Sequence, residues 1–273
     1  MADILETIVA YKKQEVERYK KELSQDTLVN RVDILRKAQT ESMKAALMAS
    51  NTGIIAEFKR KSPSKGWINR EASPSIIPHS YQNYGATALS ILTDTHFFGG
   101  NCVDIRSARL SKVNIPILYK NFIIDDYQIY QARLVGASAI LLIAACLTKD
   151  QCRDYIAKAH ELGMEVLLEM HSEADTEYAE LGPDMYGVNN RNLGTFETDV
   201  NNSLQLLARL PYDGLKVSES GISDPSVVKQ LRDYGYRGFL IGENFMKEPD
   251  PGLALASFIA QLTALSAQVE QGV

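Results

Sequence analysis

Eight short apolar runs, spread along most of the chain, constrain the fold more than any other feature of the sequence. Each has the length and composition of a parallel strand buried on both faces. The runs span residues 54–58, 88–92, 116–119, 139–143, 165–169, 185–189, 215–218 and 238–242. A doubly wound sheet more often has about five to seven strands, whereas a closed barrel needs eight β/α units. We therefore predict an α/β fold, a (β/α)8 TIM barrel.

Helical patterns separate these runs, as a barrel requires. They cover residues 76–84, 126–135, 149–162, 175–181, 203–210 and 225–234. Several end at a glycine, a residue that readily adopts the left-handed conformation that terminates helices. A closing helix is predicted over 253–266, and we expect residues 268–273 to be frayed. The barrel thus spans 54–266, and no linker or change in composition within 1–273 marks a second domain.

Residues 1–50 form a predicted N-terminal helical extension, with helices over 3–24 and 35–48. The first carries an apolar stripe against charged residues on its other faces. A dimerising coiled coil is the alternative interpretation, but the stripe is too irregular for sustained heptads. We therefore expect the extension to pack on the body of its own chain.

The composition of the chain argues against several classes of protein function. The chain has 273 residues, 45% hydrophobic, with a net charge of −5, which argues against a nucleic-acid binder that uses a broad basic surface. No run approaches the roughly 18 apolar residues of a membrane span, and the acidic, amphipathic N-terminus does not resemble a signal peptide. The three cysteines and four histidines lack metal-ligand spacing. We expect a cytoplasmic protein with reduced cysteines and no metal.

Ionisable and polar side chains follow the predicted strands, at the barrel end where active sites are built. A single polar residue after an apolar run commonly just marks the end of the strand, but seven such ends carry ionisable groups. The residues are Glu57, Lys59, Thr93, Asp94, Lys120, Glu169, Asn189, Arg191, Glu219, Ser220, Gly242 and Glu243. This concentration indicates a catalytic site.

Lys120 and Glu169 are the first candidates for proton transfer. Each ends an apolar run, so each should point into the barrel mouth, where partial desolvation suits Lys120 to donate a proton. Glu169 is a candidate base. Both could instead pair with Lys59 and Glu57 in a structural network of ions, and that arrangement is compatible with catalysis.

Glycines after the last two strands indicate a phosphate site. Gly221 and Gly242 lie just past a strand end, and a short helical turn follows Gly242. Backbone N–H groups at this part of a barrel bind phosphate. Lys59 on the first strand adjoins the eighth in a closed barrel and could reach the same group. The paired phenylalanines of residues 97–98 are by default core residues, but could line an apolar pocket or lid.

These motifs, in their order, resemble those of the indole-3-glycerol phosphate synthase family. The matching segments are IIAEFKRKSPSKG, LSILTDTHFFGGN, PILYKNFIIDDYQI, GASAILLIAACL, LGMEVLLEMH, YGVNNRNL, SESGI and FLIGENFM, within residues 54–246. The helical extension also fits this family. Phosphoribosylanthranilate isomerase shares the fold and phosphate site, but its Cys and Asp catalysts have no matching positions here.

The resemblance implies a reaction and a set of roles. The reaction is cyclisation of 1-(2-carboxyphenylamino)-1-deoxyribulose 5-phosphate to indole-3-glycerol phosphate, releasing carbon dioxide and water without a cofactor, in tryptophan biosynthesis. Lys120 would be the general acid and Glu169 the carboxylate that stabilises the charged intermediate or handles protons. The implied catalytic set is completed by Lys59, Glu57, Asn189 and Ser220. The implied substrate-binding set is Arg191, Glu219, Ser62, Gly221, Gly242, Glu243, Phe98 and Phe122.

Four positions depart from the family pattern. Asn121 and Asn192 stand where the family commonly has Asp, and His96 and Asn101 vary the loop after the second strand. Asn121 removes a charge beside the expected acid. Another sugar-phosphate isomerase or lyase is one alternative function. A silent barrel that binds a phosphorylated metabolite, or a partner through its N-terminal helices, is a second. The sequence leaves the oligomeric state open, and a monomer acting on a small sugar phosphate is the working expectation.

Overall fold

Eight parallel strands close into a barrel in the computed structural model, which describes residues 4–35, 40–192 and 197–270. The first strand, β1 (Ile54–Phe58), pairs with both β4 (Ala88–Leu92) and β10 (Tyr236–Ile241), which closes the ring. Between them lie β5 (Ile117–Lys120), β6 (Ala139–Ile143), β7 (Glu165–Met170), β8 (Met185–Asn189) and β9 (Leu215–Glu219). The predicted TIM barrel is therefore confirmed, and each predicted strand is present within two residues of its expected bounds.

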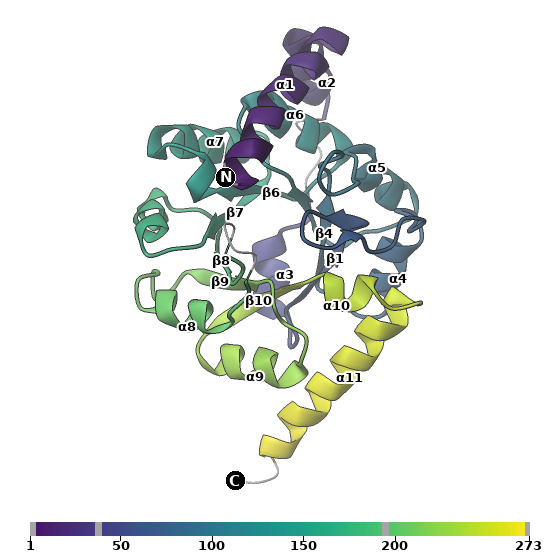
Figure 1. Cartoon of the computed structure of the whole chain (residues 1–273), viewed down its shortest axis with the longest axis vertical. Coiled ribbons are helices and arrows are strands. Elements are labelled where there is room, and N and C mark those ends of the chain that lie inside the picture. The colour runs from purple at the N-terminus through teal and green to yellow at the C-terminus, as the bar shows by residue number, and fades with distance from the viewer. Residues whose placement is uncertain (1–3, 36–39, 193–196, 271–273) are drawn as a thin grey trace.

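Helices surround the strands on the outside of the barrel (Figure 1). They are α4 (Ile77–Asn83), α5 (Val103–Leu110), α6 (Asp126–Val135), α7 (Lys149–Glu161), η2 (Ala174–Leu181), α8 (Asn201–Leu207), α9 (Pro225–Asp233), α10 (Glu243–Met246) and α11 (Pro251–Glu270). Local chemistry fixes their ends. Thr148 and Gln151 form a reciprocal capping box at the start of α7, and Gly136 ends α6 in the left-handed conformation.

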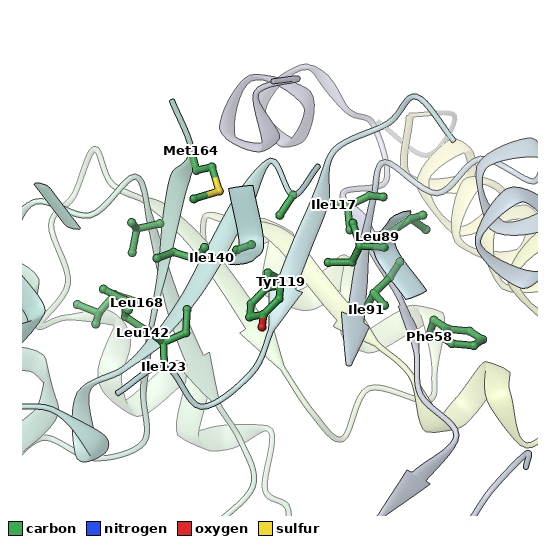
Figure 2. Close-up of a cluster of buried hydrophobic side chains, with 14 of the residues drawn as sticks. Phe58, Leu89, Ile91, Ile117, Tyr119, Ile123, Ile140, Leu142, Met164 and Leu168 are labelled. Carbon is green, nitrogen blue, oxygen red and sulfur yellow. The ribbon is translucent and has the colours of Figure 1, made fainter. Parts of the chain in front are cut away.

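Alternation along the strands divides the core into two layers. Ile55, Leu118 and Leu167 point into the barrel, whereas Leu89 and Tyr119 point outward to the helices. Figure 2 shows part of the outer layer, with Ile117 and Tyr119 on β5 and Ile140 and Leu142 on the neighbouring strand β6. Because both faces are buried, strands such as β6 are apolar throughout. The polar side chains of the barrel that line the cavity lie at the C-terminal ends of the strands or just after them.

The N-terminal extension differs from the prediction in its second part. The first helix, α1 (Ile4–Glu22), agrees with the sequence, but the single helix expected over 35–48 is wrong. The chain instead forms α2 (Gln25–Asp33) and a short α3 (Met43–Ala49). Serine caps explain both starts, because Ser24 accepts from the N–H of Thr27 and Ser42 from that of Ala45. Part of the expected helix, 36–39, lies outside the described residues.

Helix α3 closes the N-terminal end of the barrel. Met43 and Leu47 are fully buried and pack with the inward-facing side chains of the strands, and α3 is visible through the centre of the ring in Figure 1. A side chain on Gly238 would approach Leu47 Cδ1 to 3.3 Å. The closeness of this contact shows that α3 fills the bottom of the barrel.

Four smaller details also differ from the sequence prediction. Helix α5 was not expected, because its exposed ends, Val103 and Leu110, obscure the helical period. The turn after β1 forms a small hairpin of β2 (Lys61–Ser62) and β3 (Gly66–Trp67). The segment η2 is a 3₁₀ helix. Helix α11 continues through Glu270, so the expected fraying from residue 268 is wrong up to that point; residues 271–273 lie outside the described part.

A buried ion network anchors α1 to the barrel. The ammonium of Lys12 lies 2.6 Å from Asp94 Oδ2 and 2.5 Å from Glu15 Oε2, and all three side chains are almost completely buried. The other oxygen of Asp94 accepts the backbone N–H groups of Phe97 and Phe98. The extension therefore packs on the body of its own chain and contacts the loop that follows β4.

Replacing Lys12 with alanine should lower the free energy of unfolding by about 3 kcal/mol, because it leaves two buried carboxylates without their cation. Denaturant unfolding measures this change. Lys13→Ala is the matched control, since Lys13 is the neighbouring lysine of the same helix and is exposed. Equal stability of the two variants would contradict a structural role for the buried network.

In the described part of the chain, every helix falls short of the length and apolarity needed to cross a membrane.

Candidate active site

A cavity of about 320 Å³ opens at the C-terminal ends of the barrel strands. It is lined by every residue predicted from the sequence to bind or transform a substrate. The polar lining consists of Glu57, Lys59, Ser62, Lys120, Glu169, Asn189, Arg191, Glu219, Ser220, Gly221, Gly242 and Glu243, and Phe98 and Phe122 line its apolar part. The barrel thus brings together side chains that are up to 186 residues apart between Glu57 and Glu243.

Lys120 lies at the centre of the polar cluster. Its Nζ donates to Glu169 Oε2 at 2.9 Å and to Glu219 Oε2 at 2.5 Å. Lys120 and Glu219 end β5 and β9, Glu169 is the last residue but one of β7, and both carboxylates are buried. Asn189 at the end of β8 donates from Nδ2 to the second oxygen of Glu169 at 3.1 Å. Inward-facing positions on four strands therefore form one hydrogen-bonded cluster.

The environment sets the charges of this cluster. Burial alone would lower the pKa of Lys120, but Glu169 and Glu219, with Glu57 beyond them, outweigh burial and raise it. Burial would likewise raise the pKa of Glu169, yet Lys120 and His171 hold it below its usual range. For Glu219, burial and repulsion from Glu169 prevail over Lys120 and raise its pKa to about 7. The two carboxylates on one lysine thus differ widely in acidity.

A second ion pair lies on the first strand. Lys59 Nζ donates to Glu57 Oε1 at 2.7 Å, and Glu57 is buried. The cations and carboxylates therefore form two groups, Lys59 with Glu57 and Lys120 with Glu169 and Glu219. The alternative network, in which Lys120 and Glu169 pair with Lys59 and Glu57, differs from these contacts, because Lys59 pairs with Glu57 and Lys120 with Glu169 and Glu219. Both groups face the cavity.

The glycine after β10 makes room for Glu57. A Cβ on Gly242 would lie 2.3 Å from Glu57 Oε1. Gly242→Ala should therefore displace that carboxylate from Lys59 and reduce kcat/KM of the enzyme by about ten- to a hundredfold, the effect of disturbing a charged hydrogen bond. Steady-state kinetics measures the loss.

A matched double variant tests the cause. Gly242→Ala together with Glu57→Ala removes the clash, so its melting temperature should be higher than that of Gly242→Ala alone. If Gly242→Ala retained full activity, close packing of this glycine against the carboxylate would have no functional role.

Loops cross the mouth of the cavity and hold Arg191. Its Nη1 donates to Ser64 Oγ at 3.1 Å in the turn of the β2–β3 hairpin. Ser62 is buried and accepts the backbone N–H of Lys65, which tightens that turn. Phe98 and Phe122 lie opposite, with ring centroids 6.0 Å apart. The cavity therefore has a charged side and an aromatic side.

The turn after β9 is strained at its first residue. Ser220 has φ of +68°, which is unusual for a residue other than glycine, and Gly221 follows at +77°. Asn190 supports this turn by donating to the carbonyl of Ser220 and to Ser218 Oγ, both at 3.0 Å. The role of Asn190 was missed from the sequence, although it adjoins Asn189 at a strand end.

Further lining residues were also missed. Ile4, Leu5 and Ile8 of α1 form part of the cavity wall, so the apolar stripe of the extension contacts the site as well as the barrel. Asn121, one of the departures from the family pattern, also lines the cavity, and its side chain bonds to neighbours other than Lys120. Its Nδ2 donates to Thr93 Oγ1 at 2.8 Å and its Oδ1 accepts the N–H of Phe122.

Among the residues that the structure describes, no three His, Cys, Asp or Glu side chains are grouped as metal ligands would be.

The fold and the cavity define the class of this protein. It is a TIM-barrel protein whose clustered acids, lysines and strand-end glycines lie at the catalytic end of the barrel. Residues 5–258 match the family model described as "Indole-3-glycerol phosphate synthase". The chain belongs to the indole-3-glycerol phosphate synthase family, as its ordered motifs predict, and the predicted class of enzyme, a carboxy-lyase of tryptophan biosynthesis, follows from this membership.

Individual relatives support this family membership. The indole-3-glycerol phosphate synthase of Bacteroides thetaiotaomicron is 56% identical over 262 residues, which cover 95% of this chain and 98% of that protein. The Polaromonas sp. protein of the same name is 43% identical over 261 residues, covering 94% and 98%.

Solved structures that resemble the chain share its fold at low sequence identity. The 3-hexulose-6-phosphate synthase of Salmonella typhimurium has a TM-score of 0.60 at 14% identity, covering 77% of this chain and 99% of that chain. Tryptophan synthase subunit alpha of Legionella pneumophila has a TM-score of 0.58 at 14% identity, covering 85% and 96%. Because the sequence identities are low, these likenesses support the barrel fold and nothing beyond it.

Proposed function

We propose that the protein cyclises 1-(2-carboxyphenylamino)-1-deoxyribulose 5-phosphate to indole-3-glycerol phosphate, with Lys120 as the general acid. The observation that carries this proposal is the position of the Lys120 ammonium, held between two buried carboxylates in a cavity with an aromatic side. Family membership supplies the substrate class. We also propose that the enzyme acts in the cytoplasm on this small sugar phosphate, as a monomer.

The first step forms the carbon–carbon bond. The ring carbon that bears the carboxylate attacks the ketone carbon, and the ketone oxygen takes a proton from Lys120 Nζ. The raised pKa of Lys120 keeps the amine protonated until the substrate arrives, and a proton donor at the oxygen is what this addition requires. Carbon dioxide then leaves, and its bonding electrons restore the aromatic ring.

The second step removes water. The new hydroxyl takes a proton and leaves, and the neighbouring carbon loses a proton to complete the indole. Glu169 is ionised under these conditions and faces the positive charge that develops on the nitrogen. Lys59 and Glu57 form a second donor and acceptor pair, 2.7 Å apart, for these proton transfers. Asn189 holds Glu169 in place through its hydrogen bond. Ser220, in the strained turn after β9, completes the catalytic set.

Binding of the substrate uses the two sides of the cavity. The phosphate lies at the backbone of Gly221, Gly242 and Glu243, beside Ser62, and Lys59 can reach the same group. Arg191 and Glu219 contact the polar parts around the anthranilate ring. Phe98 and Phe122 cover the ring and exclude water, which strengthens the electrostatic interactions around it.

The test is a fluorescence assay for indole-3-glycerol phosphate with the purified protein and the carboxyphenylamino-deoxyribulose phosphate. We expect turnover without an added cofactor. The same sample offered other sugar phosphates should show no isomerisation, which separates this function from that of a related barrel isomerase. An absence of product at any enzyme concentration would refute the proposal and favour a barrel that only binds a phosphorylated metabolite.

A further inference from the structure

The two carboxylates that share Lys120 have unequal surroundings. Glu169 has contacts on both oxygens, because Lys120 donates to its Oε2, Asn189 donates to its Oε1, and His171 Nε2 lies 3.0 Å from Oε1. Glu219 receives Lys120 on Oε2, but its Oε1 is buried and has no hydrogen-bond partner among the described residues. His171 is therefore part of what distinguishes the two groups, and the proposed mechanism gives it no role.

The position of His171 is fixed from several sides. It follows β7 directly, and only 11% of its side chain is exposed. Its backbone N–H donates to Asp175 Oδ2 at 2.8 Å, and its carbonyl accepts from Asn202 Nδ2 at 3.2 Å. The backbone is thus held by residues of η2 and α8, and the ring has little freedom to leave Glu169.

The contact with Glu169 is mainly one of charge. Nε2 is at ion-pair distance, but its N–H direction departs from the line of a hydrogen bond. Nδ1 is buried without a hydrogen-bond partner in the described part of the chain. A neutral imidazole would gain little here, whereas an imidazolium gains the attraction of the carboxylate.

The charges around His171 are predominantly negative. Burial would lower its pKa, but the contact with Glu169, followed by the charges of Asp175 and Glu219, raises it. Lys120 faces the other side of Glu169. The remaining charged groups that line the hollow beside the ring are Arg191, Glu197 and Asp199.

The buried cluster around Lys120 needs a second positive charge if both of its carboxylates are ionised. Lys120 is one positive charge against the two carboxylates of Glu169 and Glu219, all within a buried cluster. Such a cluster is stable when its charges balance. Balance requires a proton on Glu219 or a proton on His171.

We infer that His171 is a positioning residue, which holds Glu169 and supplies the second positive charge that allows both carboxylates beside Lys120 to ionise. This inference rests on the proposed function, because it assigns His171 a part in that reaction. It acts through Glu169 and does not itself touch the reacting atoms.

Two substitutions separate charge from position. His171→Ala removes both, and we expect kcat to fall by about ten- to a hundredfold with little change in KM, because the buried carboxylate of Glu169 loses the cation beside it. His171→Gln keeps an N–H donor without the charge and should recover most of kcat at pH 8. The acid limb of its pH–rate profile should nevertheless move upward by about one pH unit, because the carboxylates lose a nearby cation.

His160→Gln is the matched control. His160 also lies beside a carboxylate, 2.8 Å from Asp184, but its side chain is 45% exposed and lies outside the cavity. Its removal should leave kcat and the pH–rate profile unchanged. A His171→Gln profile that coincides with that of the wild type would overturn the proposed charge, and wild-type kcat in His171→Ala would overturn the positioning role.

Histidine ring NMR provides a readout that is independent of activity. The chain has four histidines, so the His171 resonance is assigned by its loss in His171→Gln. We expect its pKa to fall in Glu169→Gln, where burial is no longer opposed by the carboxylate. An unchanged pKa would refute the charge contact. If the wild type makes no indole-3-glycerol phosphate, the proposed function fails while this titration still tests the pair; if the wild type is active and the His171 variants match it, only the inference fails.

Discussion

Turnover should fall by about a thousandfold or more in Lys120→Ala, because this variant loses the proton donor for the ketone oxygen. The variant should also lose stability in a pH-dependent way. Without the ammonium, Glu169 and Glu219 remain as buried like charges. Their carboxylates become easier to protonate, so the loss of stability relative to the wild type should be larger at pH 8 than at pH 5.

Single-turnover kinetics and thermal melts at the two pH values measure these effects. Lys149→Ala is the control, because Lys149 also contacts two carboxylates, Glu177 and Glu180, but on the surface. That variant should keep its activity and show no pH-dependent loss. If Lys120→Ala retained activity within a few-fold of the wild type, another group would have to be the acid.

Glu219→Gln should make the protein more stable at alkaline pH while making it a poorer enzyme. The raised pKa of Glu219, about 7, means that the folded protein holds this proton more tightly than the unfolded chain. The resulting stabilisation is complete below the unfolded pKa and is lost as the pH rises through 7. Glutamine has no proton to lose, so the variant should gain on the order of 2–3 kcal/mol relative to the wild type between pH 5 and pH 8.

Activity should move in the opposite direction, with kcat/KM lower by about tenfold or more, because a carboxylate that contacts Lys120 is gone. Thermal melts across this pH range, together with steady-state kinetics, test both parts. Glu177→Gln serves as the comparison, since Glu177 is 74% exposed and contacts a surface lysine. A stability difference for Glu219→Gln that is the same at pH 5 and pH 8 would contradict the assignment of the raised pKa.

Much of the fold was predictable because each strand is buried on both faces. An apolar run such as 139–143 has few other ways to fold in a chain of this size, and β6 has those bounds. The site residues followed from the same rule, since polar side chains at strand ends meet at one mouth. The helix predicted over 35–48 failed because apolar spacing was given more weight than the capping serine, Ser42.

Other parts of the site depend on contacts that no local pattern encodes. Nothing near Leu5 indicates that the first turn of α1 lies against the cavity formed by β5 and β9. Several polar residues follow strands, and His171 is one of them. Only its distance to Glu169 distinguishes it from the others. The raised pKa of Glu219 likewise depends on its burial and on the nearness of Glu169, which only the folded structure shows.

Helix α3 closes the N-terminal end of the barrel, so the cavity opens at the C-terminal ends of the strands. Met43 and Leu47 close that N-terminal end, and inward-facing aliphatic side chains such as Leu118 and Leu167 pack with them in the interior. In the reaction proposed above, carbon dioxide and water form beside Lys120 and leave through the same mouth as the indole product. Helix α3 contributes to this common route from the opposite end of the molecule, because it closes the barrel there.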